Sequence, residues 1–199
     1  MTGQPEQPHG AERARGDVEV MELSGAQQAF ARRVAESKAT APHVYFEHPL
    51  SDPPELATLV AAVAQSLRDV PILNGSYRDG RAELYSRVNL AVGVETGATL
   101  AFPVIRDADG KDAEAIRGEI AALADEVRVG ALAAPAFAGA TFTVIDMSSS
   151  GAAAFGPVIA RGQAATLGVG TERLTLACDN RIVQAGQGAA FLACVVERL

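Results

Sequence analysis

The stretch Leu174–Leu192, LTLACDNRIVQAGQGAAFL, joins the elements that decide how the end of this chain folds. Its apolar beginning predicts a strand over 173–178. A polar turn, Asp179–Ala185, follows, and the apolar residues beyond it predict a closing helix over 189–198.

Upstream of this stretch, the pattern mixes helices and strands. Helices are expected from Ser24 to about Lys38, from Pro54 to just before Pro71, and onward from Asp112, each with an N-terminal signal and an apolar stripe. Further strands are expected over 43–47, 84–95, 99–105, 139–147 and 164–169, with a hairpin at Gly97. Because the order lacks regular βαβ alternation, we predict an α+β fold with a mixed sheet.

Composition sets the limits of the fold. The chain has 199 residues, of which 48% are hydrophobic and 5% aromatic, so small aliphatic side chains must fill one sizeable core. Residues 1–17 are polar and rich in proline and glycine, and we expect a flexible tail there. Residues 18–199 are expected to form a single domain.

Charge and cysteine content exclude several classes of function. The net charge of −7 without a basic run argues against nucleic acid and against an anionic membrane surface. No stretch approaches the ~20 apolar residues that span a bilayer, and the start lacks a signal peptide's apolar core, so a cytoplasmic location is expected. Cys178 and Cys194 have no metal-ligand spacing, so we predict buried small side chains and no metal site.

Four segments, in this order, carry a family resemblance, and they cover nearly everything after the tail. They resemble the catalytic domain of the dihydrolipoamide acyltransferases, the E2 cores of the 2-oxoacid dehydrogenase complexes. The segments are MELSGAQQAFARRVAESKATAPHVYF (21–46), VPILNGSYRDG with YSRVNLAVGVETGATLAFPVIRDADG (70–110), FAGATFTVIDMSSSGAAAFGPVIARGQAATLGVG (137–170) and LTLACDNRIVQAGQGAAFL (174–192).

The resemblance implies a chloramphenicol-acetyltransferase-like fold: a two-layer sandwich with a mixed sheet and flanking helices. It also implies a homotrimer, or a multiple of trimers, with each active site between two subunits. An acyl thioester of CoA or of a carrier protein would be the co-substrate, with no bound cofactor, and a small molecule would accept the acyl group. In the family, a histidine acts as general base, and a serine or threonine stabilises the oxyanion.

The turn departs from the family pattern at the catalytic position. Asn180 stands where the histidine is expected, between Asp179 and Arg181, which match the family and which we expect to brace the turn. Gln184 and Ala185 also differ from the pattern. An amide does not take up a proton near neutral pH, and general-base catalysis contributes roughly 10²–10⁴-fold. Asn180 could bind substrate, or it could have only a structural role through a hydrogen bond.

The oxyanion segment has changed as well. Ile145 stands where the family has serine, and Asp146 follows it. A carboxylate beside a developing oxyanion would be unfavourable, and loss of a polar donor costs about 2.7–4 kcal/mol. Replacement donors nearby are Thr143, Ser148, Ser149 and Ser150, unless the serines simply form a loop.

Other candidate residues lie outside these two segments. His43, in APHVYF, could substitute for the missing base, although a structural histidine is the alternative; His48 is expected to be exposed. The stretch Asn74–Gly80 is predicted to be a turn; the family resemblance places it near the CoA side of the channel, which leaves a substrate role as the alternative. Asp107 and Asp109 are expected in a structural turn.

Three functions remain open. The first is a standalone acyltransferase with an altered site, suited to accessory or natural-product metabolism: two regions are shorter than in the family, and we expect no lipoyl domain before the tail. The second is a trimeric scaffold or binding protein that has lost catalysis. The third is another reaction, such as a cyclisation, in the repurposed channel.

Overall fold

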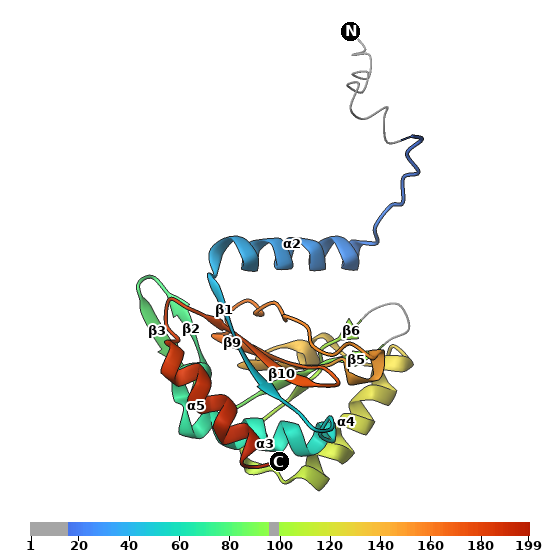
Figure 1. Cartoon of the computed structure of the whole chain (residues 1–199). Coiled ribbons are helices and arrows are strands. Elements are labelled where there is room, and N and C mark those ends of the chain that lie inside the picture. The colour runs from blue at the N-terminus through green and yellow to red at the C-terminus, as the bar shows by residue number, and fades with distance from the viewer. Residues whose placement is uncertain (1–15, 96–99) are drawn as a thin grey trace. The chain divides into compact units, whose positions relative to one another are not determined.

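The computed structural model describes residues 16–95 and 100–199 (Figure 1). Contacts divide the chain into a unit of residues 1–32 and a unit of residues 33–199, and the second unit carries the fold. No helix in the described ranges is long and apolar enough to cross a membrane.

A six-stranded mixed sheet forms the centre of the larger unit. In spatial order its strands are β1 (His43–Pro49), β10 (Arg173–Asp179), β9 (Ala165–Val169), β8 (Phe142–Asp146), β4 (Leu90–Val92) and β7 (Val104–Ile105). The pairs β9–β8 and β8–β4 are parallel, and the other three pairs are antiparallel. The prediction of an α+β fold with a mixed sheet is confirmed.

Three helices pack on one face of this sheet (Figure 1): α3 (Leu56–Asp69), α4 (Ala113–Arg128) and α5 (Ala185–Val196). The expected stripe of α3 is buried at Leu59, Val60, Val63 and Leu67. Asp112 caps α4 as predicted, because its Oδ1 accepts a hydrogen bond from the Ala115 N–H at 2.8 Å. Helices and sheet together make the predicted two-layer sandwich.

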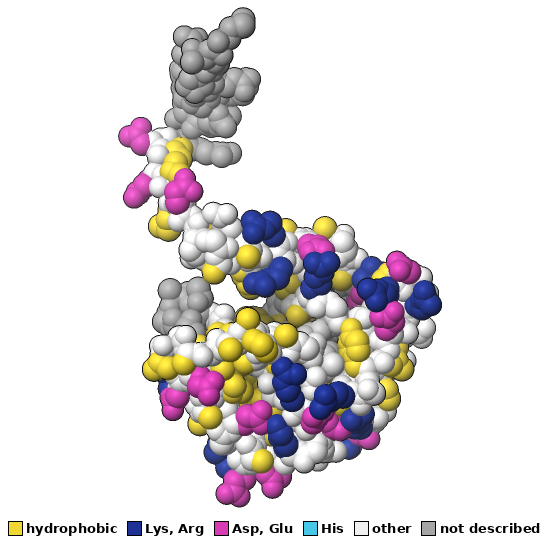
Figure 2. Space-filling model, turned by 180° about the vertical axis from the view of Figure 1, so that it is seen from behind, with side chains coloured by type: hydrophobic (Ala, Val, Ile, Leu, Met, Phe, Trp, Pro, Cys, Tyr) yellow, Lys and Arg dark blue, Asp and Glu magenta, His cyan; other side chains and the backbone are white. Residues whose placement is uncertain are grey.

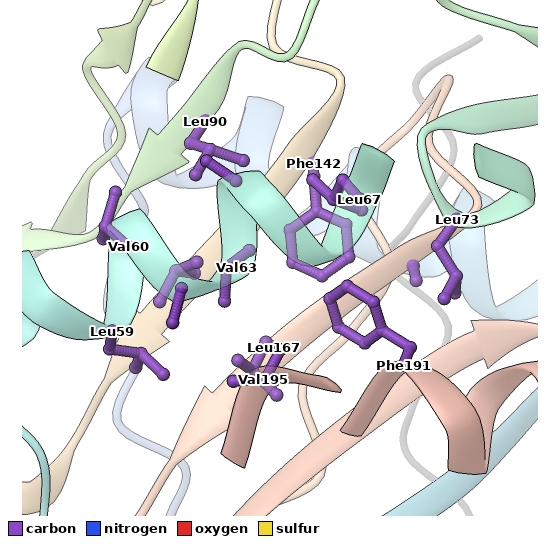
Figure 3. Close-up of a cluster of buried hydrophobic side chains, with 14 of the residues drawn as sticks. Leu59, Val60, Val63, Leu67, Leu73, Leu90, Phe142, Leu167, Phe191 and Val195 are labelled. Atoms are coloured by element: carbon purple, nitrogen blue, oxygen red, sulfur yellow. The ribbon is translucent and has the colours of Figure 1, made fainter. Parts of the chain in front are cut away.

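The core lies between these helices and the sheet (Figure 3). Phe142 of β8 and Phe191 of α5 meet there with ring centroids 5.6 Å apart, which is the spacing of a favourable tilted aromatic pair. Gly188 of α5 allows the helix to approach β1, since a Cβ at this position would lie 2.4 Å from the Phe46 ring. Cys178 is buried in this core, as predicted, and Cys194 is half-buried.

An irregular segment, residues 152–163, crosses the opposite face of the sheet. Gly168 of β9 accommodates it, because a Cβ there would lie 2.9 Å from the Phe155 ring. Ser37 near the end of α2 (Gly25–Thr40) donates a hydrogen bond to the Ile159 carbonyl at 2.7 Å. As predicted, Ser24 caps α2, since its Oγ accepts from the Gln27 N–H at 3.3 Å. No residue of α2 is buried.

The predicted strand over 84–95 is wrong as a single element. It is divided into the end of β3 (Arg81–Leu84), then β4, then β5 (Val94–Glu95). The break has a clear cause: the Asn74 side chain donates to the carbonyls of Tyr85 and Arg87, at 3.0 and 2.9 Å, so these groups are not available to a neighbouring strand. The strand expected over 99–105 is likewise divided into β6 (Leu100–Ala101) and β7.

A further correction concerns one of the two predicted turns. The stretch predicted as a turn over 74–80 is mostly strand β2 (Gly75–Arg78), which pairs with β3, and the turn itself is Asp79–Gly80 with φ values of 47° and 82°. Asp107 and Asp109 lie in a turn as predicted; Asp107 pairs with Arg87 and Asp109 with Arg68.

The remaining elements are short. The antiparallel pair β5–β6 confirms a hairpin around the position predicted for it, while Gly97 itself and most of the tail lie outside the described residues. The described part of the chain also contains four 3₁₀ turns: Pro71–Leu73, Ala108–Gly110, Ala134–Phe137 and Ser148–Ser150.

Candidate functional site

Apart from Thr143, which is the second residue of β8, the predicted site residues divide between two opposite ends of the sheet. Asp146 at the end of β8 lies opposite Val169, which in turn lies opposite Leu174 at the start of β10. Asp179 is at the other end of β10, five residues away, which is about 17 Å at 3.3–3.4 Å per residue. We call Asp179–Gln184 the asparagine end and Ile145–Ser150 the aspartate end. One chain therefore does not bring them together.

At the asparagine end, an ion pair supports the turn. Asp179 is buried, and its carboxylate accepts hydrogen bonds from Arg181 Nε at 2.9 Å and Nη2 at 2.6 Å, as well as from the Arg181 backbone N–H at 3.1 Å. These bonds to Asp179 raise the pKa of Arg181. The guanidinium also lies 3.9 Å from the centroid of the Tyr77 ring, which is a cation–π contact. This geometry fits the expected bracing role.

Asn180 itself is exposed between these two residues. Its backbone N–H donates to the Pro42 carbonyl at 2.9 Å, which fixes the turn against the start of β1. Within the part of the chain that the structure describes, its side-chain amide makes no hydrogen bond. The amide is therefore available to a ligand or to another subunit.

His43 lies beside Asn180, because it pairs with Asp179 across β1 and β10. Its Nδ1 is 2.8 Å from the Ala41 carbonyl, and its Nε2 accepts a hydrogen bond from the Ile159 N–H at 3.1 Å. Both contacts fit a neutral ring that carries its proton on Nδ1. Burial lowers the pKa of His43. Both ring nitrogens are occupied, so in this arrangement His43 holds backbone in place and offers no lone pair to a substrate.

Gln184 begins the helix that follows the turn. Its backbone N–H donates to Gln187 Oε1 at 2.9 Å, and α5 starts at Ala185. The helix was predicted to start at residue 189, which is four residues too late, because the glutamine cap was not recognised. In this chain, Gln184 is therefore the N-cap residue of α5.

The aspartate end is held mainly by bonds within its own loop. Asp146 Oδ1 accepts from the Ser148 N–H at 2.9 Å, and the Ser150 hydroxyl donates to the Met147 carbonyl at 2.6 Å. Ser148 is half-buried and Ser149 is exposed. The carboxylate of Asp146 thus stabilises the 3₁₀ turn.

Two further candidates lie in strand β8, one in a packing contact and the other in a hydrogen bond. Ile145 is half-buried, and its Cα and Cγ2 would each lie 3.8 Å from a Cβ on Gly93. Thr143 is buried, and its hydroxyl donates to Gln163 Oε1 at 2.8 Å. The Gln163 amide in turn donates to the Ala140 carbonyl at 3.4 Å. The Thr143 hydroxyl proton is therefore already donated to another side chain of the same chain.

Beside the asparagine end, the structure contains a cavity of about 420 Å³, within the ~300–1,000 Å³ range of small-molecule sites. Asp179, Arg181 and Gln163 line it, together with Tyr77 and Tyr85. The Tyr85 hydroxyl donates to the Gly162 carbonyl at 2.8 Å and so ties β3 to the segment 152–163.

Sequence reasoning missed this cavity because its walls come from distant segments. One available signal was Asp79-Gly80 between two alternating runs, which is typical of a hairpin. Among residues 16–95 and 100–199, no group of three His, Cys, Asp or Glu side chains could hold a metal ion.

The comparisons with known proteins agree with this fold. Residues 55–199 match the family model for the 2-oxoacid dehydrogenases acyltransferase catalytic domain. The chain is 31% identical, over 163 residues, to the dihydrolipoyllysine-residue acetyltransferase component of the pyruvate dehydrogenase complex of Mycoplasma capricolum, covering 72% of this chain and 37% of the relative. The corresponding Bacillus subtilis component is 31% identical over 174 residues, covering 74% and 38%.

Solved structures give the same result. A probable dihydrolipoamide acetyltransferase from Listeria monocytogenes superimposes with a TM-score of 0.86 at 26% identity, covering 92% of this chain and 94% of that one. Chloramphenicol acetyltransferase, at 10% identity, shares the fold with a TM-score of 0.54, over 84% of this chain and 94% of that one. The curated relatives are longer, and the chain spans 29% to 48% of their length. The chain belongs to the family of 2-oxoacid dehydrogenase acyltransferase catalytic domains.

Proposed function

We propose that this protein transfers an acyl group from a thioester, of CoA or of a carrier protein, to a small-molecule acceptor at an altered site. The site would combine the asparagine end of one copy with the aspartate end of another, in a homotrimer or a multiple of trimers. The observation that carries this proposal is the separation of the two ends by about 17 Å or more on a family fold. A second copy is needed to complete the site.

A solved relative supports the choice of positions for the site. It is a dihydrolipoamide acetyltransferase of Azotobacter vinelandii, with a TM-score of 0.87 at 24% identity over 98% of this chain and 96% of that one. In that protein, a serine, a histidine and an asparagine four positions after the histidine were investigated for catalytic roles. Asn180 and Gln184 have the same spacing, and Ile145 stands where the resemblance expects serine.

The altered residues restrict the chemistry. An amide at position 180 can donate and accept hydrogen bonds, but it cannot remove a proton from the acceptor. His43 does not replace the base, because its ring nitrogens are bonded to Ala41 and Ile159. The acceptor must therefore ionise readily, and the protein would contribute mainly by holding the two substrates together. Such a reaction suits accessory metabolism in the cytoplasm.

A second candidate function is a trimeric binding or scaffold protein without catalysis. The half-buried aliphatic Ile145 favours it, because an apolar side chain there provides no donor for an oxyanion. A protein with such an inactive site would still assemble into trimers, because the fold and the catalytic activity are separable.

Restoring the histidine tests the proposal. In Asn180→His, acetyl transfer from acetyl-CoA to dihydrolipoamide should rise by roughly 10²-fold or more over the parent chain, because a general base is regained. Release of CoA is followed by mass spectrometry, since the half-buried Cys194 could react with thiol reagents. Asn180→Gln is the matched control and should stay at the parent rate.

The scaffold alternative predicts a different result. Neither the parent chain nor Asn180→His would then release CoA, and calorimetry would show no binding of CoA to either protein. A monomer in sedimentation analysis would overturn both the trimer and the shared site.

A further inference from the structure

We propose that the cavity beside the asparagine end is a binding site for a small organic anion, a molecule that carries a carboxylate or a phosphate group. The inference concerns binding and does not depend on acyl transfer. It rests on three arginines, Arg33, Arg78 and Arg161, which reach the cavity from three different segments.

The three guanidinium groups differ from that of Arg181 in that none of them donates a hydrogen bond to a carboxylate of a described residue. Arg78 Nη1 is 3.6 Å from Glu83 Oε2, and Arg161 Nη1 is 3.7 Å from Glu36 Oε2, so each forms an ion pair that is too long for a hydrogen bond. Arg33 forms no ion pair with another described residue. By contrast, Arg181 donates directly to a carboxylate. We call Arg33, Arg78 and Arg161 the rim arginines. Within the described residues, their N–H donors are therefore available to solvent or to a ligand.

The charge of the cavity also differs from that of the chain. Its lining includes four arginines and three carboxylates, whereas the whole chain has a net charge of −7. Figure 2 shows basic and acidic side chains gathered at the end of the molecule where α2 finishes. A local positive excess in a concave site raises the concentration of anions there. An arginine fork matches the planar geometry of a carboxylate or a phosphate.

The rest of the lining suits the organic part of such a ligand. Tyr77 lies against Arg181, and Tyr85 contributes a second ring whose hydroxyl lies 2.9 Å from Ser76 Oγ. A few polar groups on a mostly preformed wall are typical of small-molecule sites. The volume of about 420 Å³ leaves room for more than an inorganic ion.

Calorimetry on the full chain at low ionic strength tests this site with three probes. These are 4-hydroxybenzoate, phenyl phosphate and the neutral amide 4-hydroxybenzamide. We expect at least one anion to bind and the amide not to bind; which anion binds more tightly distinguishes a carboxylate ligand from a phosphate ligand. Binding should weaken as salt is added, because the contacts are exposed to solvent.

Variants of the rim supply the residue-level test. Arg161→Gln should weaken anion binding by about three- to fivefold, the size of one exposed charged contact. Glu36→Gln should act in the opposite direction and tighten it by about twofold, because Arg161 loses its competing carboxylate. Arg173→Gln is the matched control: Arg173 Nη1 forms a similarly long pair with Glu47 Oε2, at 3.8 Å, away from the cavity lining.

Three results would overturn the inference. They are equal binding of the neutral amide, equal effects of Arg161→Gln and Arg173→Gln, and no binding of either anion at millimolar concentration. All three variants change exposed side chains, and thermal unfolding checks that they remain folded. The assay contains no acyl donor, so a failure of acyl transfer would leave its result unaffected.

Discussion

The two ends of the sheet differ in how they are held. At the asparagine end, a buried carboxylate, an arginine stacked on Tyr77 and a histidine bonded on both nitrogens connect four segments of the chain. At the aspartate end, Asp146 and Ser150 bond within their own short loop. The asparagine end is therefore tied to more segments of the chain than the aspartate end, and we expect it to be the more rigid of the two.

The largest effect should come from linking the two ends. In Asn180→Cys with Asp146→Cys, a disulfide requires Cα atoms closer than about 7 Å, and one chain holds these ends about 17 Å apart or more. We therefore expect oxidation to give covalent dimers and trimers on a non-reducing gel.

The background for this experiment is Cys194→Ser. Cys178 can stay, because burial raises the pKa of its thiol to about 12 and keeps it unreactive. Each single cysteine variant serves as a control. A double variant that stays monomeric with two free thiols would contradict a site shared between copies.

The next largest effect concerns the two aspartates. Asp179→Asn should lower the free energy of unfolding by about 2 kcal/mol, since the buried Asp179 carboxylate accepts charge-assisted hydrogen bonds from Arg181 that an amide cannot replace in full. Asp146→Asn should cost about 1 kcal/mol or less, because the amide oxygen can still accept from Ser148. Urea unfolding followed by circular dichroism measures both. Equal losses would mean that the two ends are held alike.

Local signals in the sequence predicted most helices of this fold. The apolar spacing of Leu59, Val63 and Leu67, and the caps at Ser24 and Asp112, follow from neighbours within one or two turns. The broken strand could not be predicted in this way. Its cause is the Asn74 side chain, whose bonds to Tyr85 and Arg87 span 11 and 13 positions.

The site was less predictable than the fold. Family resemblance points to Asn180 and Ile145, but their separation depends on the pairing register of β8, β9 and β10, which residues close together in sequence do not determine. The same reason hid the cavity, because Arg33, Arg78 and Arg161 lie far apart along the chain and meet only after folding.

A smaller effect is expected from the cap of α5. Gln187→Ala removes the acceptor of the Gln184 N–H at the asparagine end and should cost about 1 kcal/mol. Ser150→Ala removes a hydroxyl from the exposed loop at the aspartate end and should cost at most about 0.5 kcal/mol. Both values come from urea unfolding at one pH. A larger loss for Ser150→Ala would reverse the comparison.

The smallest effect should be a dependence of stability on pH at the asparagine end. The pKa of His43 is lowered by burial, with the Lys38 charge acting in the same direction, and despite opposing effects from the Ala41 carbonyl and Asp179. Above the unfolded pKa of about 6.5, the ring is neutral in both states. As the pH falls below it, the unfolded chain takes up a proton that the folded protein does not, so stability must fall until the folded pKa is reached.

Protonation would also place a second N–H on Nε2, which faces the Ile159 N–H. His43→Gln should therefore reduce the slope of unfolding free energy between pH 7.5 and pH 5.5, because glutamine does not titrate. His48→Gln makes the same change at the aspartate end of the same strand, where His48 lies opposite Leu174 and contacts the neighbouring Pro49 carbonyl. Its unfolding curves supply the comparison for the other end of the same strand. If His48→Gln flattened the slope and His43→Gln did not, the pH-sensitive contact would belong to the other end of the sheet.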